Sequence, residues 1–148
     1  MVENESIFRQ RIETFLKDNG FLPSEWDSFE LSHGNGQDKE HIISKIRKNV
    51  GKKSGLYVYE KNGSTLYVGK AKSLFGRIKS HYRESYKRVP GDTKQGTWHA
   101  FFSANAGQVK IFWKEEKSEK IRRVIERMLA YVKRPKFEEF KEEYESKK

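Results

Sequence analysis

Two short alternating stretches, GLYVYE at 55–60 and STLYVG at 64–69, constrain the fold more than any other part of the chain. Successive side chains of a strand point to opposite faces, so each stretch separates its tyrosines from its aliphatic residues. The residues between the two stretches are typical of a tight turn. The whole segment therefore predicts an antiparallel hairpin.

The length of the turn decides which side chains share a face. A two-residue turn would place Val58 opposite Tyr67 and would mix tyrosines with aliphatic residues on both faces. A three-residue loop at 61–63, with its glycine left-handed in a bulge, would instead place Tyr57 opposite Tyr67. Because a slip of one residue exchanges the faces, the apolar alternation favours the three-residue loop. The expected hairpin then has an aliphatic face of Leu56, Val58, Leu66 and Val68 and a tyrosine face of Tyr57, Tyr59, Thr65 and Tyr67.

Apolar periodicity predicts helices on both sides of this hairpin. Helices are expected over residues 6–20 and 38–50, and two more are expected to begin after the capping residues Ser73 and Ser118. Residues 109–113 alternate as a third strand. The apolar stripes expected to face the core are Ile7, Phe8, Ile12, Phe15 and Leu16 in the first helix and Ile121, Ile125, Met128 and Val132 in the last.

These elements predict an α+β fold in which a small three-stranded antiparallel sheet is flanked by helices. The chain of 148 residues is long enough for a single core. We expect residues 1–53 to form an N-terminal helical extension packed on the main domain and residues 54–138 to form that domain. Residues 139–148 are expected to form a charged C-terminal helix or tail.

The positive charge is concentrated in the middle of the chain. Residues 1–40 carry a net charge of −5, residues 41–114 carry +13 and residues 115–148 carry +2, within a total of +10. A concentrated cationic surface favours a polyanion, because neutralised phosphates release condensed counterions. A solvated basic face without a partner is the alternative. The interleaved aromatic and glycine residues favour nucleic acid, with the basic end of the helix expected at 38–50 as one contact.

The chain lacks the features of several other functional classes. It contains no cysteine, which excludes disulfides, thiolate metal sites and thiol nucleophiles. No apolar run reaches membrane-spanning length, and the N-terminus has no signal-peptide core. We therefore expect a soluble cytoplasmic protein without a membrane partner, and we assume a monomer.

Polar residues recur at regular intervals in and after the hairpin. Tyr67 follows Tyr57 by ten residues, Arg77 follows Tyr67 by ten, and His81 lies one helical turn after Arg77. Glu126 lies beside the apolar stripe of the helix that begins after Ser118. Taken singly, each of these residues would be a packing tyrosine or a surface charge, so their order along the chain is the informative feature.

In that order the residues resemble the GIY-YIG nucleases, a family that includes domains of homing endonucleases, the excision-repair incision subunit and restriction enzymes. The sequences GLY at 55–57 and YVG at 67–69 stand where the family has its two strand motifs. The arginine of the following helix and a later helical glutamate complete the pattern. The resemblance covers about residues 54–138.

The resemblance implies a DNA endonuclease that uses a divalent cation, Mg²⁺ or Mn²⁺. Tyr57 would be the general base or would orient the attacking water, with Tyr67 as its hydrogen-bonding neighbour. Because a free tyrosine has a pKa of about 10, full ionisation of Tyr57 near pH 7 would require nearby cations to lower its pKa by about three units. Arg77, Lys70 or Lys72 and the metal ion would be those cations. Arg77 would hold the scissile phosphate, Glu126 would bind the cation, and His81 would orient a phosphate or Tyr57. The expected nucleic-acid-binding residues are Lys70, Lys72, Lys79 and Arg83.

One departure from the family pattern leaves a second function open. Glu138 stands where the family often has asparagine. This departure favours, as an alternative, a nucleic-acid-binding module on the same fold with weak or lost cleavage. A protein-interaction domain whose basic face meets an acidic partner is a third hypothesis.

Overall fold

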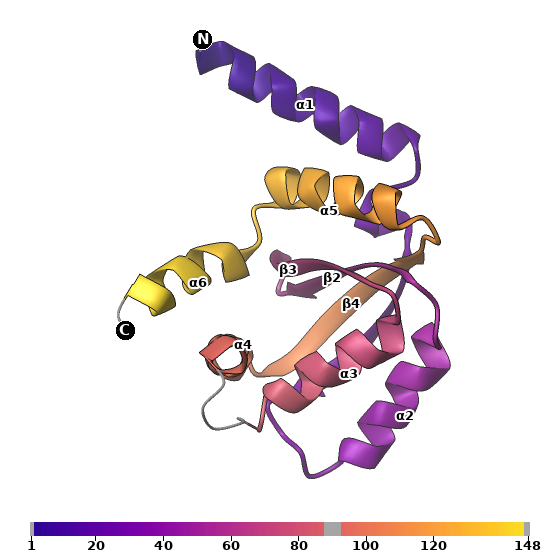
Figure 1. The fold of residues 1–148 in the computed structure, drawn as a ribbon, viewed down its shortest axis with the longest axis vertical. Coiled ribbons are helices and arrows are strands. Elements are labelled where there is room, and N and C mark those ends of the chain that lie inside the picture. The colour runs from indigo at the N-terminus through magenta and orange to yellow at the C-terminus, as the bar shows by residue number, and fades with distance from the viewer. Residues whose placement is uncertain (1, 88–92, 147–148) are drawn as a thin grey trace.

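The computed structural model describes residues 2–87 and 93–146, which fold around one four-stranded antiparallel sheet (Figure 1). The strands lie in the order β1-β4-β2-β3. They are β1 (Asp27–His33), β2 (Gly55–Lys61), β3 (Ser64–Ala71) and β4 (Gly107–Glu115). The helices are α1 (Val2–Asp18), α2 (Lys39–Val50), α3 (Leu74–Glu84), α4 (Thr93–Ala104), α5 (Glu119–Lys133) and α6 (Lys136–Ser146), and a 3-10 turn η1 (Pro23–Glu25) precedes β1. None of the described helices has the length and apolar composition that crossing a bilayer requires.

Helices cover both faces of the sheet and divide the core into two layers (Figure 1). On one face, α2, α3, α4 and α6 pack against the tyrosines of β2 and the inward residues of β1 and β4. On the other face, α1 and α5 pack against Leu56, Val58 and Phe112. We call these the tyrosine layer and the aliphatic layer. Both are fully buried at their centres, so the tyrosine face of the hairpin is as much a core face as the aliphatic one.

The observed sheet has four strands, one more than the three that the sequence predicted. The additional strand, β1, comes from the segment that was expected to be a helical extension. Its inward residues Phe29, Leu31 and His33 alternate with exposed ones, and β1 pairs with β4 along its whole length. Residues before position 53 therefore complete the main sheet, and the expected division of the chain at that position stays a prediction.

The hairpin turn contains two residues, and the expected three-residue loop is wrong. Asn62 and Gly63 have φ angles of 51° and 79°. Positive φ at both central residues is the requirement of a type I′ turn, for which Asn-Gly is the preferred sequence. Lys61 accordingly pairs with Ser64. The local preference of the turn therefore prevails over the apolar alternation that favoured a longer loop.

A β-bulge then restores the separation of the two faces. The register shifts after Tyr59, which leaves Leu66 without an opposite residue and places Tyr67 opposite Tyr59. Tyr57 lies opposite Gly69, and not opposite Tyr67 as the three-residue loop would have required. The tyrosines still share one face, as expected. Leu66 packs in the tyrosine layer, which corrects its expected place among the aliphatic residues.

The two motif glycines are required by close packing across the sheet. A Cβ atom at Gly69 would overlap the ring and hydroxyl of Tyr57. A Cβ atom at Gly55 would overlap the backbone oxygen of Lys114 on the neighbouring strand β4. One glycine therefore admits the tyrosine ring, and the other admits the next strand.

The apolar stripes of α1 and α5 face the core only in part. On α1, Leu16 is buried in the aliphatic layer, whereas Ile7, Phe8 and Phe15 are exposed. On α5, Ile121 is exposed and Leu129 is fully buried. The expectation that both whole stripes face the core is therefore wrong, because α1 projects past the sheet and packs along α5 (Figure 1).

His33 is buried in the tyrosine layer with no hydrogen-bonding partner for either ring nitrogen among the described residues. Its ring stacks on Phe102 and meets the ring of Tyr59 edge-on. Burial, together with the charges of His81 and Lys61, lowers the pKa of His33 from 6.5 to about 3. His33 is therefore a neutral core residue near neutral pH.

We predict that Gly69→Ala lowers the free energy of unfolding by about 1–3 kcal/mol, because the added methyl group forces the ring of Tyr57 out of its place. Denaturant unfolding followed by circular dichroism measures the change. The matched control is Gly76→Ala in α3, where the added Cβ meets Ser73 at ordinary distances. Replacing a glycine inside a helix by alanine raises the free energy of unfolding by up to about 1 kcal/mol, so we expect Gly76→Ala to be neutral or stabilising. Equal stability of the two variants would contradict the close packing at Gly69.

We predict that the protein loses stability as the pH falls below about 6.5, in part because His33 must bind a proton on unfolding. Its pKa is lower in the folded state, so the stability that it contributes is present above 6.5 and is lost as the pH falls toward 3. Replacing His33 by Phe should reduce the slope of unfolding free energy against pH by up to about 1.4 kcal/mol per unit. The control is His41→Gln, at an exposed position of α2. An unchanged slope in the His33 variant would refute this account.

Candidate active site

Tyr57 lies at the centre of the tyrosine layer and has no exposed surface. Its hydroxyl is 2.8 Å from Nε2 of His81 on α3. Its ring also contacts the rings of Tyr59 and Tyr67. The close approach to Gly69 and the cap of α3 fix this geometry, because Ser73 accepts the N–H of Gly76 at the first turn of the helix that carries His81.

Burial raises the pKa of Tyr57 well above its ordinary value of 10. Tyr67 and Tyr59 raise it further, and the charge of Arg77 opposes the shift without overcoming it. Tyr57 is therefore a neutral phenol at neutral pH. The charge of Arg77 by itself therefore does not lower the pKa of Tyr57 toward 7, as ionisation of Tyr57 at neutral pH would require.

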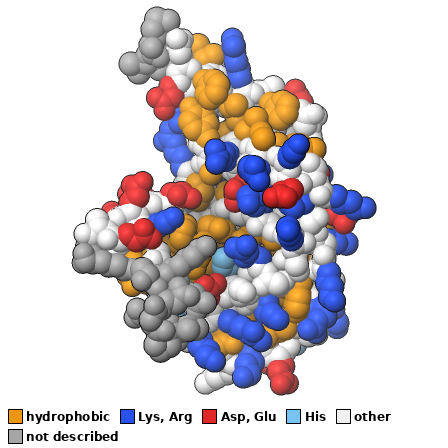
Figure 2. Space-filling view, viewed as in Figure 1, with side chains coloured by type: hydrophobic (Ala, Val, Ile, Leu, Met, Phe, Trp, Pro, Cys, Tyr) orange, Lys and Arg blue, Asp and Glu red, His pale blue; other side chains and the backbone are white. Residues whose placement is uncertain are grey.

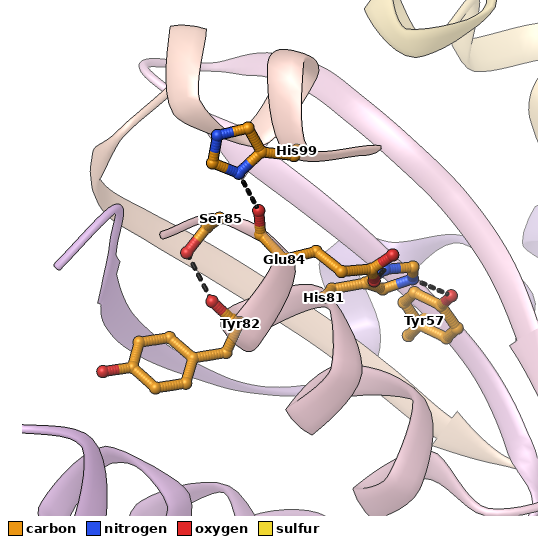
Figure 3. A network of polar contacts seen from close by, with 6 residues as sticks. All are labelled: Tyr57, His81, Tyr82, Glu84, Ser85 and His99. Carbon is orange, nitrogen blue, oxygen red and sulfur yellow. Dashed lines mark hydrogen bonds and ion pairs between the residues drawn. The ribbon is translucent and has the colours of Figure 1, made fainter. Parts of the chain in front are cut away.

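His81 bridges Tyr57 and a carboxylate (Figure 3). Its Nδ1 lies 3.3 Å from Oε1 of Glu84, on the opposite edge of the ring from Tyr57. Burial lowers the pKa of His81 below 6.5, while the hydrogen bond and the charge of Glu84 raise it and the charge of Arg77 lowers it. His81 is thus a neutral histidine directed at Tyr57. Of its two expected roles, the contact with Tyr57 is the one that the geometry favours.

Arg77 is exposed on the first turns of α3, and its charge acts on each of the other four expected catalytic residues. Burial is the main cause of the pKa shift at each of them, and the guanidinium of Arg77 lowers the pKa of Tyr57, Tyr67, His81 and Glu126. The other four expected catalytic residues therefore lie within electrostatic range of Arg77.

Tyr67 lies between the buried and the exposed parts of this arrangement. Burial raises its pKa to about 12, and the charges of Glu126 on α5 and Glu138 on α6 add to the rise. Arg77 opposes it. Two carboxylates and one guanidinium thus lie within electrostatic range of Tyr67.

An aromatic stack places α6 next to Tyr67. Trp98 and Phe137 stack in parallel at 4.3 Å, and Tyr67 meets their rings edge-on at 4.9 and 5.3 Å. Phe137 is buried, so its neighbour Glu138 is held at the exposed rim beside Glu126. Trp98 and Phe137 are packing residues of the site that the sequence pattern did not assign to it.

The residues around Glu126 fit a hydrated divalent cation. Glu126 is half-buried; burial raises its pKa, the charges of Lys70, Arg127 and Arg77 lower it, and Glu138 raises it. Hard cations prefer oxygen ligands and keep most of their waters when one or two carboxylates hold them. Within residues 2–87 and 93–146, no cluster of three or more His, Cys, Asp or Glu side chains encloses a metal position. An open carboxylate site of this kind suits Mg²⁺ or Mn²⁺.

The four expected nucleic-acid-binding residues are distributed unevenly. Lys70 is close enough to lower the pKa of Glu126 and so belongs to the site. Lys72 precedes α3 and Arg83 lies in its last turn, and both are exposed. Lys79 lies over the ring of Phe75 at 4.9 Å, where Arg47 of α2 lies over the same ring at 4.7 Å.

Glu84 is the residue of this network that sequence reasoning missed. It follows His81 by three residues on α3, so the two side chains share one face of the helix. This spacing is the signal that would have found it. The other polar contacts at the end of α3, from His99 and Ser85, involve backbone oxygens and could not be derived from a sequence pattern (Figure 3).

Comparisons with known proteins give the following result. No family model matches the chain. Among solved structures, the chain is similar to the magnesium-bound GIY-YIG N-terminal endonuclease domain of UvrC from Thermotoga maritima, with 25% identity and a TM-score of 0.45 over 63% of this chain and 94% of that domain. Two point mutants of the same domain, each bound to its catalytic divalent cation, give 25% and 24% identity, with a TM-score of 0.45 over 63% of this chain and 93% of theirs. The chain thus resembles the GIY-YIG endonuclease domains, at low sequence identity.

Proposed function

We propose that this chain is a metal-dependent endonuclease that hydrolyses phosphodiester bonds of DNA. The observation that carries the proposal is the position of Arg77, whose charge acts on Tyr57, Tyr67, His81 and Glu126 alike. A fork-shaped guanidinium suits a phosphate, and a proton acceptor and a carboxylate lie within its range. These are the parts that phosphodiester hydrolysis requires.

Because Tyr57 is neutral, we infer that it relays a proton from the attacking water to His81 and does not form a tyrosinate. The attacking water must reach the Tyr57 oxygen in the DNA complex, because Tyr57 has no exposed surface in the free chain. As that water gives its proton to the Tyr57 oxygen, the Tyr57 proton moves to Nε2 of His81, 2.8 Å away. The water oxygen forms the new bond to phosphorus, and the bond from phosphorus to the 3′ oxygen breaks. The 3′ oxygen takes its proton from solvent.

Arg77 holds the scissile phosphate and offsets the charge that develops on its oxygens. A divalent cation bound at Glu126 would supply further charge compensation at the leaving oxygen. Lys70 lies beside Glu126 and contacts the same phosphate or its neighbour. Glu138, at the rim, stands in place of an uncharged amide and would offer such a cation a second oxygen donor near Glu126.

DNA extends from the site along the basic surface of α2 and α3. Arg47 and Lys79 lie over the one ring of Phe75, and neither belongs to an ion pair of the described residues. Two like charges on one ring repel, and a bound phosphate would relieve that repulsion. Figure 2 shows Lys and Arg side chains spread over the lower part of the molecule, where α2 and α3 lie, with few acidic side chains among them.

A second candidate function is a nucleic-acid-binding module without efficient cleavage. Glu138 favours it, because a carboxylate at the rim repels a phosphate that approaches Glu126. The basic surface of α2 and α3 would serve either function. Cleavage assays separate the two.

We predict that the protein nicks supercoiled plasmid in Mg²⁺ or Mn²⁺, that Glu126→Gln abolishes the nicking, and that Arg77→Ala slows it by about 10²- to 10³-fold. Gel separation of nicked from supercoiled plasmid measures the rates. Arg123→Ala is the control, because it removes an exposed guanidinium of α5 that pairs with Glu119. Nicking by Glu126→Gln at the normal rate would contradict the proposal. Salt-sensitive binding by the normal protein without any nicking would favour the binding module.

We predict that the double change Arg47→Gln and Lys79→Gln weakens duplex binding and reduces the slope of log affinity against log salt by about 1.8, as expected for two lost phosphate contacts. Fluorescence anisotropy with a labelled duplex in EDTA measures binding without cleavage. The control removes the same charge from α1, at the far end of the molecule, by Arg11→Gln and Lys17→Gln (Figure 1). Equal slopes for the two double variants would show that the α2 and α3 surface does not bind DNA.

A further inference from the structure

We propose that Glu84 is a positioning residue that holds His81 in the one tautomer able to accept the proton of Tyr57. The inference rests on the proposed endonuclease function and assigns a residue to it that the sequence pattern did not include. Three side chains carry it: the His81 ring lies within hydrogen-bonding distance of both the Tyr57 hydroxyl and the Glu84 carboxylate (Figure 3).

The two edges of the His81 ring have different partners. Nε2 lies 2.8 Å from the Tyr57 hydroxyl, which can donate or accept, and Nδ1 lies 3.3 Å from Oε1 of Glu84. An ionised carboxylate only accepts hydrogen bonds. His81 is 1% exposed, so water does not replace either partner. The carboxylate is therefore the group that decides which ring nitrogen carries the hydrogen.

A neutral imidazole has one N–H, and its place determines the direction of proton flow. With the hydrogen on Nδ1, that N–H donates to Glu84 and the lone pair of Nε2 faces the Tyr57 hydroxyl, which donates to it. With the hydrogen on Nε2, two acceptors face each other at Glu84, and His81 has no free site for the proton of Tyr57. The contact with Glu84 favours the first tautomer, which is the one the proposed reaction needs.

Glu84 is held firmly although it is the last residue of α3. The N–H at Nδ1 of His99 on α4 donates to the backbone oxygen of Glu84 at 2.8 Å. The hydroxyl of the next residue, Ser85, accepts the N–H of Gly34 at 2.9 Å. The side chain of Glu84 is 15% exposed, and that of His81 is 2% exposed. An exposed pair at this spacing would contribute little, but this pair is largely out of water.

The same carboxylate faces the charge that forms when His81 accepts a proton. The groups around the ring are Tyr57 and Tyr59 from β2, Tyr67 from β3, Trp98 and Phe102 from α4, and His33 from β1. From its own helix, Arg77 acts against a positive imidazolium and Glu84 acts in its favour. Glu84 thus orients the neutral His81 ring before the proton transfer and stabilises the imidazolium that forms after it.

The first test is the tautomer itself, which nitrogen-15 NMR of histidine-labelled protein reports from the shifts of the two ring nitrogens. We expect the Nδ1–H form for His81 at pH 7.5 and a mixture of tautomers in Glu84→Ala. Glu84→Gln keeps an oxygen acceptor without the charge and should retain the Nδ1–H form. An Nε2–H tautomer in the normal protein, or an unchanged tautomer in Glu84→Ala, would overturn the proposal.

The second test is plasmid cleavage by the same variants. Glu84→Ala should lower kcat by about 10- to 100-fold, the range seen when an orienting partner is lost, with KM for DNA unchanged. The acid limb of the kcat profile should move to lower pH, because Glu84 raises the pKa of His81. Glu119→Ala, at an exposed carboxylate of α5, is the control. A loss confined to KM would contradict a role through His81.

The two proposals fail in different ways. Absence of cleavage by the normal protein in either cation would refute the endonuclease function, while the NMR measurement would still decide whether Glu84 sets the tautomer. Normal cleavage together with an unaltered kcat in Glu84→Ala would leave the endonuclease function standing and refute the role of Glu84.

Discussion

The rest of the structure depends on the burial of a sheet face that carries hydroxyl groups. Tyr57 and Tyr59 have no exposed surface, and their rings fill the layer between the sheet and α3 and α4. Aromatic rings contribute a large apolar area, but each buried hydroxyl costs free energy unless it has a partner. Tyr57 obtains its partner from His81, whereas the hydroxyl of Tyr59 has none among the described residues. Only the first of these two tyrosines is therefore placed for proton transfer.

The hairpin could be predicted from the sequence because face alternation is a local property. Asn62-Gly63 is itself the signal for the type I′ turn, but the apolar alternation favoured a longer loop. The bulge at Leu66, which reconciles the two, leaves no clear sequence signal and could not be predicted. The strand β1 was missed for a related reason. Its apolar residues Phe29 and Leu31 are few, and pairing with β4 completes what its own pattern leaves ambiguous.

The candidate site also has features that the local sequence predicts and features that depend on contacts between distant residues. Arg77, His81 and Glu126 could be found from their order along the chain, since their spacing resembles a known pattern. Burial depends on contacts between elements: the ring of Tyr57 is packed against Tyr67 of β3 and His81 of α3, and burial raises the pKa of Tyr57. Residue types could be predicted, but their protonation states required the fold.

The raised pKa of Tyr57 determines which mechanism this site can support. Ionising an ordinary tyrosine at pH 7 already costs about 4 kcal/mol, and burial adds to that cost. A proton that passes through Tyr57 to His81 as water attacks avoids a free tyrosinate. The remaining free-energy cost is that of forming the His81 imidazolium, which burial and the charge of Arg77 disfavour. The carboxylate of Glu84, 3.3 Å from Nδ1, is the group that offsets it. Burial of the tyrosine face thus makes an acidic partner for His81 a requirement of the proposed chemistry.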